Sequence, residues 1–109
     1  MSYDPSIDAR IVKIIARWPG TARKKMFGGV CHLHKGNMFC GVYQSYLVLR
    51  LGEEAATAAL EQKHTKPFDI TGKPMRGWVM VDKDGFKSDD ALKNWLAQAK
   101  AFASKLPPK

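Results

Sequence analysis

The stretch from Lys24 to Leu51 constrains the fold more than any other part of the chain. Its sequence, KKMFGGVCHLHKGNMFCGVYQSYLVLRL, holds three apolar-rich runs separated only by Lys35-Gly36 and Gln44-Ser45. Short runs rich in β-branched and aromatic residues, joined by two-residue loops, are typical of β-hairpins. We therefore expect a three-stranded antiparallel meander. Its strands would be residues 30–34, 37–43 and 46–51.

Two-residue loops fix the register of this meander, and that register sorts its side chains. With His34 opposite Asn37, Cys31 would face Cys40. One face would then be wholly apolar, which supports the register, because a one-residue slip would mix the two faces. That face would carry Cys31, Leu33, Met38, Cys40, Val42, Leu47, Leu49 and Leu51. The opposite, mixed face would carry Val30, His32, His34, Asn37, Phe39, Gly41, Tyr43, Tyr46, Val48 and Arg50.

Local signals predict three helices around the meander. Asp4 is a favourable N-cap residue and Pro5 suits the first helical position, so a helix is expected there, ending at Pro19-Gly20. The Ala-rich stretch from Glu53 to Gln62 has acidic residues in its first turn, where they favour a helix. Ser88 is the expected N-cap of a third helix that ends before the final prolines.

Two further strands are expected between the second and third helices. GWVMV, residues 77–81, is a strand pattern, whereas FDITGKPM, residues 68–75, predicts a short edge strand or a loop. The order α-β-β-β-α-β-β-α predicts an α+β fold, a two-layer sandwich with a mainly antiparallel sheet and helices on one face. At 109 residues, the chain is expected to form a single domain spanning residues 1–109.

The charge balance favours acidic partners. Lys and Arg number 18 against 10 Asp and Glu, a formal net charge of +8, and such a balance is compatible with salt-sensitive nucleic-acid binding. The residues expected to carry that binding are Arg10, Lys13, Arg17, Arg23, Lys24 and Lys25. No apolar run approaches the roughly 20 residues of a membrane span, and the N-terminus lacks the pattern of a secretory signal. A cytoplasmic location without membrane contact is therefore expected.

Residues with reactive or metal-binding side chains are few. Cys31 and Cys40 could bond across the strands, although two reduced core thiols are the usual state in a cytosolic protein. His32 and His34 share one strand face but lack a third ligand, and no motif places His64. No nucleophile elbow or metalloprotease motif is present. We expect no enzymatic activity, no cofactor and no metal.

The mixed face of the meander is the expected contact surface. Tyr and Arg are enriched in protein interfaces, and aromatic side chains on a sheet also stack the bases of single-stranded nucleic acids. A third alternative is that these aromatic side chains pack against the chain itself. The residues expected to form the surface are Phe39, Tyr43, Tyr46, Val48 and Arg50.

Several separated blocks recur together in this order. They are RKKMFGGV (23–30), GNMFCGV (36–42), LRLG (49–52), PFD (67–69), TGKPM (71–75), GWV (77–79) and LPPK (106–109). With these blocks the chain resembles the TfoX N-terminal domain family over nearly its whole length, as a stand-alone domain. The resemblance implies a two-layer α+β fold and kinship with the Sxy/TfoX regulators of natural competence in bacteria, whose longer members carry a second, helical domain. It implies no catalytic residues.

The family's repeated positions fit turn and packing roles, with Arg50 as a candidate ligand contact. In this chain they are Met26, Phe27, Gly28, Gly29, Arg50, Pro67, Gly72, Pro74 and Trp78. We therefore expect a small non-enzymatic regulatory or protein-interaction module that acts with a protein partner or as a homodimer. The alternative is a nucleic-acid-binding protein that uses the basic side of the first helix and residues 23–25.

Overall fold

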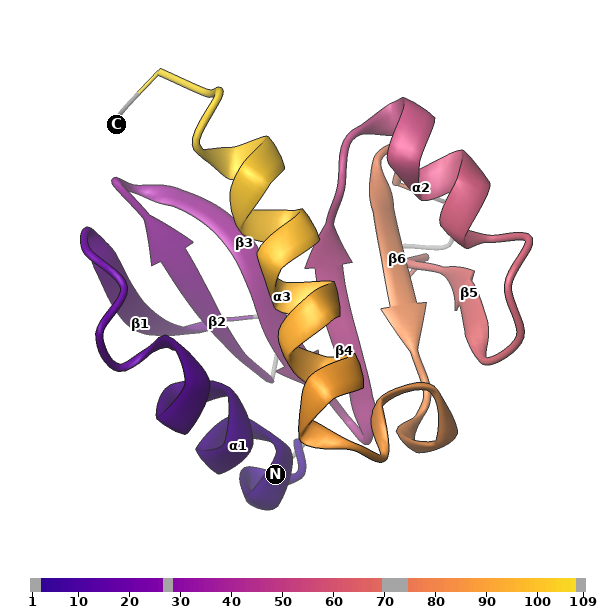
Figure 1. Cartoon of the computed structure of the whole chain (residues 1–109), viewed down its shortest axis with the longest axis horizontal. Helices are drawn as coiled ribbons and strands as arrows, with labels where there is room; N and C mark the ends of the chain where they lie inside the picture. The colour runs from indigo at the N-terminus through magenta and orange to yellow at the C-terminus, as the bar shows by residue number, and fades with distance from the viewer. Residues whose placement is uncertain (1–2, 27–28, 70–74, 108–109) are drawn as a thin grey trace.

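The computed structural model describes residues 3–26, 29–69 and 75–107. Within these ranges, ten elements follow one another (Figure 1). They are α1 (Pro5–Ile15), β1 (Thr21–Met26), β2 (Gly29–His34), β3 (Asn37–Tyr43), β4 (Tyr46–Arg50), α2 (Glu53–Ala59), β5 (Thr65–Pro67), β6 (Trp78–Val81), the 3₁₀ turn η1 (Lys83–Phe86) and α3 (Asp89–Ala103).

The strands form one open sheet in the order β1-β2-β3-β4-β6-β5, and every named pair is antiparallel. Helix α3 crosses β3 and β4 with α1 beside it, as Figure 1 shows. Helix α2 packs near β6, and its Ala56 and Ala59 belong to the hydrophobic cluster that also includes residues of α1 and α3. The predicted α+β class is therefore confirmed.

The N-terminal ends of α1 and α3 follow the predicted local chemistry, whereas α1 ends at Ile15, before the predicted stop at Pro19-Gly20. The Asp4 side chain accepts a hydrogen bond from the Ser6 amide at 2.9 Å, with Pro5 in the first turn of α1. The Ser88 hydroxyl accepts one from the Ala91 amide at 3.0 Å. Both side chains satisfy amides that a helix N-terminus leaves without partners. These two N-caps are confirmed, while α2 ends at Ala59 and is shorter than predicted.

The predicted register of β2 and β3 is wrong beyond the hairpin turn. His34 pairs with Asn37 and Leu33 with Met38 as expected, but the ladder then shifts so that His32 pairs with Cys40. Phe39 is the extra residue of a β-bulge, and it lies on the same face as Cys40. From Cys40 to Arg50, each side chain lies on the face predicted for it. In β2 and at residues 37–39, the side chains predicted for the core face lie on the opposite face, and those predicted for the mixed face lie under the helices.

The bulge separates the two cysteines. Cys31 pairs with Gly41, and a Cβ on Gly41 would lie 3.2 Å from the Cys31 Cβ, so these two positions share a face. Cys40 lies in the core under the helices. The predicted pairing of Cys31 with Cys40 is wrong, and both thiols are free and buried. Burial raises the pKa of both thiols, most strongly that of Cys40.

Two strand assignments also differ from the prediction. Residues 21–26, for which no strand was predicted, form the edge strand β1, whose ladder with β2 runs from Thr21 opposite His34 to Met26 opposite Gly29. The other edge strand, β5, occupies residues 65–67, where no strand was predicted, and the described residues of 68–75 lie outside any strand, in agreement with the predicted loop alternative. Of that stretch, residues 70–74 lie outside the described part of the chain. The strand at the end of GWVMV is confirmed as β6.

The sheet has a hydrophobic cluster on each face. The larger one lies under α1 and α3 and includes Ile11, Phe39, Leu49 and Leu96, all without measurable exposure. The second, on the opposite face, is built around Val48, Phe68 and Met80. Within the described ranges, no helix has the length and apolar character needed to cross a bilayer.

Candidate functional site

Aromatic and methionine side chains cover the sheet face opposite α1 and α3. We call this surface the aromatic face, and its members are Met38, Tyr43, Tyr46, Val48, Phe68, Met75, Trp78 and Met80. Strand alternation places most of them together, since Tyr43 pairs with Tyr46 and Val48 with Met80. Phe68 lies between Tyr43 and Trp78, with ring centroids 6.3 and 5.7 Å away. Tyr43, Tyr46 and Trp78 remain partly exposed around the buried centre.

Two cations border the aromatic face. Lys66 donates a hydrogen bond of 2.8 Å to the Tyr46 hydroxyl and lies 4.5 Å from the centre of that ring. The hydrogen bond to Tyr46 raises the pKa of Lys66. At the end of β4, the Arg50 guanidinium lies 5.5 Å from the centre of the Trp78 ring and 5.6 Å from that of Phe102. Cations held on aromatic rings in this way are attracted by the ring quadrupole, so the border of the face carries positive charge at two points.

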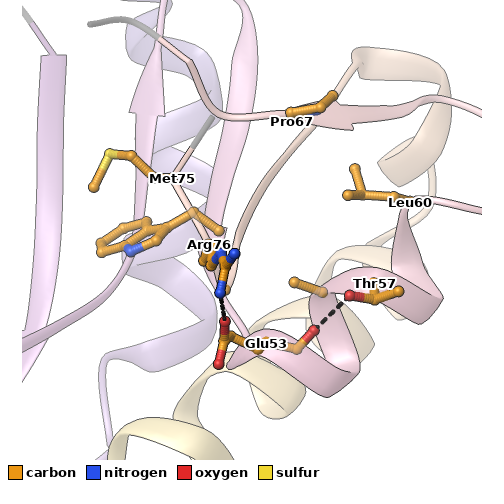
Figure 2. A pocket seen from close by; sticks show the side chains of 9 residues that line it. Glu53, Thr57, Leu60, Pro67, Met75 and Arg76 are labelled. Carbon is orange, nitrogen blue, oxygen red and sulfur yellow. Dashed lines mark hydrogen bonds and ion pairs between the residues drawn. The ribbon is translucent and has the colours of Figure 1, made fainter. Parts of the chain in front are cut away.

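A groove of about 300 Å³ adjoins the aromatic face between α2 and the β5–β6 region (Figure 2). Leu60 and Thr57 come from the α2 side, while Pro67 and Met75 line the opposite side. At its mouth, Arg76 and Glu53 form an ion pair of 3.3 Å in which both side chains are more than two-thirds exposed. Such an exposed pair contributes little to stability, so it can open when another group enters the groove.

Three of the five residues predicted for the contact surface lie at the surface of this face. Tyr43, Tyr46 and Arg50 are partly exposed, whereas Val48 lies buried beneath them. Phe39 lies on the other side of the sheet, without measurable exposure, 6.3 Å from the Trp18 ring centroid. Its predicted exposure on the mixed face is wrong because the bulge turns it under the helices.

Four members of the aromatic face that lie outside the meander, and the bordering Lys66, were not predicted as site residues. The four members are Phe68, Met75, Trp78 and Met80. All five residues lie at least 15 positions beyond Leu51 in the sequence, and only the sheet order β4-β6-β5 brings them beside the meander. The alternation in GWVMV was the available signal, since it places Trp78 and Met80 on one face of a strand.

The six predicted basic residues do not form one surface. Arg10 donates to the Phe86 carbonyl at 2.9 Å and pairs with Asp89 at 3.3 Å, so it ties α1 to η1 and α3. Arg23 donates to Asp8 at 3.0 Å, and this hydrogen bond raises the Arg23 pKa. Both guanidinium groups are therefore engaged in holding elements together.

The other four predicted basic residues are exposed. They are Lys13, Arg17, Lys24 and Lys25. None of the four takes part in an ion pair with another residue in the described ranges. In β1, Lys24 and Lys25 point to opposite faces of the sheet, as neighbouring strand residues do. This reduced set leaves two basic areas, one at the C-terminal end of α1 and in the turn after it, and one along the β1 edge.

Asp8 and His32 form a buried polar pair under α1. The Nε2 atom of His32 lies 2.8 Å from Oδ1 of Asp8, and the two residues are 2 % and 7 % exposed. The nearest thiol across the strand pair, Cys40, is fully buried and has a raised pKa, so it is not an available nucleophile. His34 is also buried, and its Nδ1 has no hydrogen-bond partner among the described residues. We therefore interpret the Asp8–His32 pair as a structural contact.

One group of side chains in the described ranges has the spacing of metal ligands. It consists of His64, Asp82 and Asp84. His32 and His34, the pair considered as metal ligands in the sequence analysis, lie under the helices and are not part of it. No sequence motif indicated a role for His64. Because this residue lies 18 positions before Asp82, the sequence did not indicate that the two side chains are close in the fold.

The fold and its surfaces define a small basic α+β module with one covered sheet face and one aromatic face. The family model of the TfoX N-terminal domain matches residues 13–103. The chain therefore belongs to the TfoX N-terminal domain family. A search of curated proteins finds no match. Of the family's repeated positions, Gly29, Arg50, Pro67 and Trp78 lie in described elements, while Phe27, Gly28, Gly72 and Pro74 lie outside the described residues.

Proposed function

We propose that this protein is a non-enzymatic interaction module whose working surface is the aromatic face. The observation that carries the proposal is the cluster of partly exposed Tyr43, Tyr46 and Trp78 around a buried apolar centre. Tyr, Trp, Met and Arg are the residue types enriched in protein interfaces. A buried centre with amphipathic rings around it matches the anatomy of an interface before its partner binds.

The charges at its border favour an acidic protein partner over a second copy of this chain. Lys66 and Arg50 lie beside the rings, and the whole chain carries a net charge of +8. Two copies brought face to face would place these cations in one interface, whereas an acidic surface would complement them. We propose a regulatory role in the cytoplasm on the basis of the likeness to Sxy/TfoX regulators.

Affinity capture from nuclease-treated lysate tests the proposal. Wild type and the Tyr46→Glu variant are compared with Val12→Glu, which places the same charge on the exposed side of α1. We expect wild type and Val12→Glu to retain a protein that Tyr46→Glu loses, with unchanged circular dichroism in all three. Equal retention by all three would refute the role of the aromatic face. Light scattering that shows a dimer in wild type and a monomer in Tyr46→Glu would assign the face to a second copy instead.

Nucleic-acid binding is a second candidate, favoured by the exposed charges of Lys13, Arg17, Lys24 and Lys25. Phosphate contacts make affinity fall steeply with salt, by a slope of about 0.9 for each contact. A duplex titration at two salt concentrations should therefore give a slope that decreases by about two in the double variant Lys13→Glu/Arg17→Glu. The same slope in wild type and variant, or no binding at low salt, would reject this candidate.

A further inference from the structure

His64, Asp82 and Asp84 meet where the segment after α2 passes η1. One ligand atom from each residue lies within 4.8 Å of the other two. The Nδ1 atom of His64 and Oδ1 of Asp82 are 3.3 Å apart. Ligand atoms bound to one ion at about 2.0–2.2 Å are separated by roughly 3 to 4.4 Å. The trio can therefore contact one cation after small side-chain rotations.

The backbone holds these three residues together without help from a ligand. The Asp82 amide donates to the His64 carbonyl at 2.9 Å, and the Asp84 amide donates to the Asp82 carboxylate at 3.0 Å. The Trp95 indole donates to the Gly85 carbonyl at 3.0 Å and so anchors η1 to α3. These contacts span two segments and a helix, so the approach of His64 to the two aspartates is a property of the fold.

Gly85 makes this close approach sterically possible. A Cβ at that position would lie 2.3 Å from Cγ1 of Val81 and 3.1 Å from the Cβ of His64. His64 itself has a φ of 71°, in the left-handed region that non-glycine residues adopt infrequently. A side chain at residue 85 would therefore clash with Val81 and press on His64, so the backbone at this point of η1 would have to shift.

Space for further ligands lies beside the trio. A cavity of about 400 Å³ has His64, Asp84, Asn94 and Gln98 among the residues that line it, together with the cationic side chain of Lys63. Three protein ligands with an open side are the arrangement of zinc sites that keep water as an additional ligand. One imidazole nitrogen with two carboxylate oxygens suits divalent first-row transition ions better than calcium or magnesium, which prefer oxygen alone.

We propose that His64, Asp82 and Asp84 form a binding site for one divalent transition-metal ion of the Zn²⁺ class, with water completing the coordination. This site is independent of the aromatic face, and it goes beyond the interaction role proposed above. It also runs against the expectation from sequence that the chain holds no metal, because the sequence did not place His64 near the two aspartates.

Lys87 competes with a metal ion for Asp84. Its Nζ lies 3.4 Å from Oδ1 of Asp84, and the lysine side chain is 77 % exposed. An exposed pair of this kind is worth about 0.5 kcal/mol, which corresponds to roughly a twofold effect on affinity. Removing the lysine charge should therefore tighten metal binding, because the carboxylate no longer has to exchange one cation for another.

Isothermal titration of tag-free protein with Zn²⁺ tests the site, with the visible absorption of added Co²⁺ as a spectroscopic readout. We expect one equivalent to bind to wild type, with affinity reduced about tenfold or more in both His64→Gln and Asp84→Asn, since even outer contacts of a metal site are worth that much. Glu54→Gln, which removes an exposed carboxylate on α2, should bind like wild type.

Lys87→Gln should bind about twofold more tightly, and Lys13→Gln, an equal loss of charge on α1, should not. Circular dichroism and a urea midpoint confirm that each variant is folded. The proposal is overturned by the absence of stoichiometric binding in wild type, or by equal affinities in wild type, His64→Gln and Asp84→Asn. It is also overturned if Glu54→Gln weakens binding as much as these two variants, since that result describes non-specific association with surface carboxylates.

Discussion

Buried polar residues on the covered face of the sheet explain why the predicted faces were wrong in β2 and at residues 37–39. That prediction assumed that only apolar side chains face the core. His32 and Asn37 both lie under the helices and are nearly inaccessible. Each is accommodated by a partner distant in sequence: Asp8 of α1 for His32, and the Pro107 carbonyl, 2.9 Å from the Asn37 amide nitrogen. A buried polar group with such a partner avoids most of its desolvation cost. Neither partner could be read from the meander itself.

Caps, by contrast, were predictable because their chemistry lies within a few residues. Asp4 accepts hydrogen bonds from the amide and the hydroxyl of Ser6, and its carboxylate lies 3.0 Å from Nζ of Lys83. The side-chain hydrogen bond from Ser6, followed by that from Lys83, lowers the pKa of Asp4 from 3.8 to about 2. The folded state therefore holds this carboxylate ionised at a pH where the unfolded chain is protonated.

We expect the stabilisation from Asp4 to be complete above pH 4 and to disappear as the pH falls from about 4 to about 2, because the unfolded chain binds the proton first. Asp4→Asn keeps a capping side chain but neither titrates nor pairs with Lys83. Urea midpoints should therefore differ between wild type and Asp4→Asn at pH 5 and converge near pH 2. Glu54→Gln serves as the control, and a constant difference between wild type and Asp4→Asn across this range would contradict the assignment.

At the scale of elements, the bulge in β3 decides which side chains enter the core. Phe39 and Cys40 both lie under the helices although they are consecutive, and Met38 lies on the aromatic face. The hairpin turn was predictable from Lys35-Gly36, where both residues have positive φ, of 51° and 86°. The bulge was not predictable, because an extra residue within a strand leaves the loop lengths unchanged. Its side chain packs against Trp18, which lies outside the meander.

Replacing Phe39 with alanine tests whether its ring fills the core, as in the structure, or belongs to a contact surface, as predicted from sequence. Phe39 has no measurable exposure, so Phe39→Ala should lower the free energy of unfolding by about 3–5 kcal/mol, as expected for a buried aromatic ring. The neighbouring Met38→Ala, on the partly exposed face, should cost clearly less. Urea denaturation measures both changes. Near-wild-type stability of Phe39→Ala would mean that the ring does not fill the core.

The edge strand β1 was missed for a related reason. TARKKM has no apolar alternation to mark it as a strand. Its formation rests on the ladder with β2 and on the contact of Arg23 with Asp8, 2.9 Å between Nη2 and the carboxylate. Part of the candidate surface was predictable nevertheless, since Tyr43, Tyr46 and Arg50 followed from alternation within β3 and β4. The partners from β5 and β6 depend on sheet order, which alternation does not encode.

On the scale of the whole molecule, charge acts over the full width of the protein. The chain measures about 30 × 29 × 27 Å along its principal axes, close to the Debye length of roughly 30 Å at 0.01 M salt. At 0.15 M that length falls to about 8 Å, so only neighbouring charges still interact. The net charge of +8 therefore opposes the compact state mainly at low ionic strength.

We expect the urea midpoint of the wild type to rise when NaCl is increased from about 10 to about 150 mM, because salt screens this repulsion. In Lys13→Glu/Arg17→Glu, which lowers the net charge by four units at exposed positions of the first helical region, the rise should be smaller. Urea is the suitable denaturant because it adds no ions. An equal rise in both proteins would attribute the effect to something other than net charge.

The bulge at Phe39 also determines how β3 can accommodate the deletion or insertion of one residue. A chain lacking residue 39 could pair His32 with Cys40 and Leu33 with Met38 in an uninterrupted ladder, so every remaining side chain would keep its side. Such a deletion would leave the topology intact but would remove the Phe39 ring and leave a cavity in the core beside Trp18. One residue inserted between Phe39 and Cys40 would also restore regular alternation, so every existing side chain would keep its face. The pairing of the following residues with β2 would shift by two positions, so a deletion removes core volume, whereas an insertion changes the register.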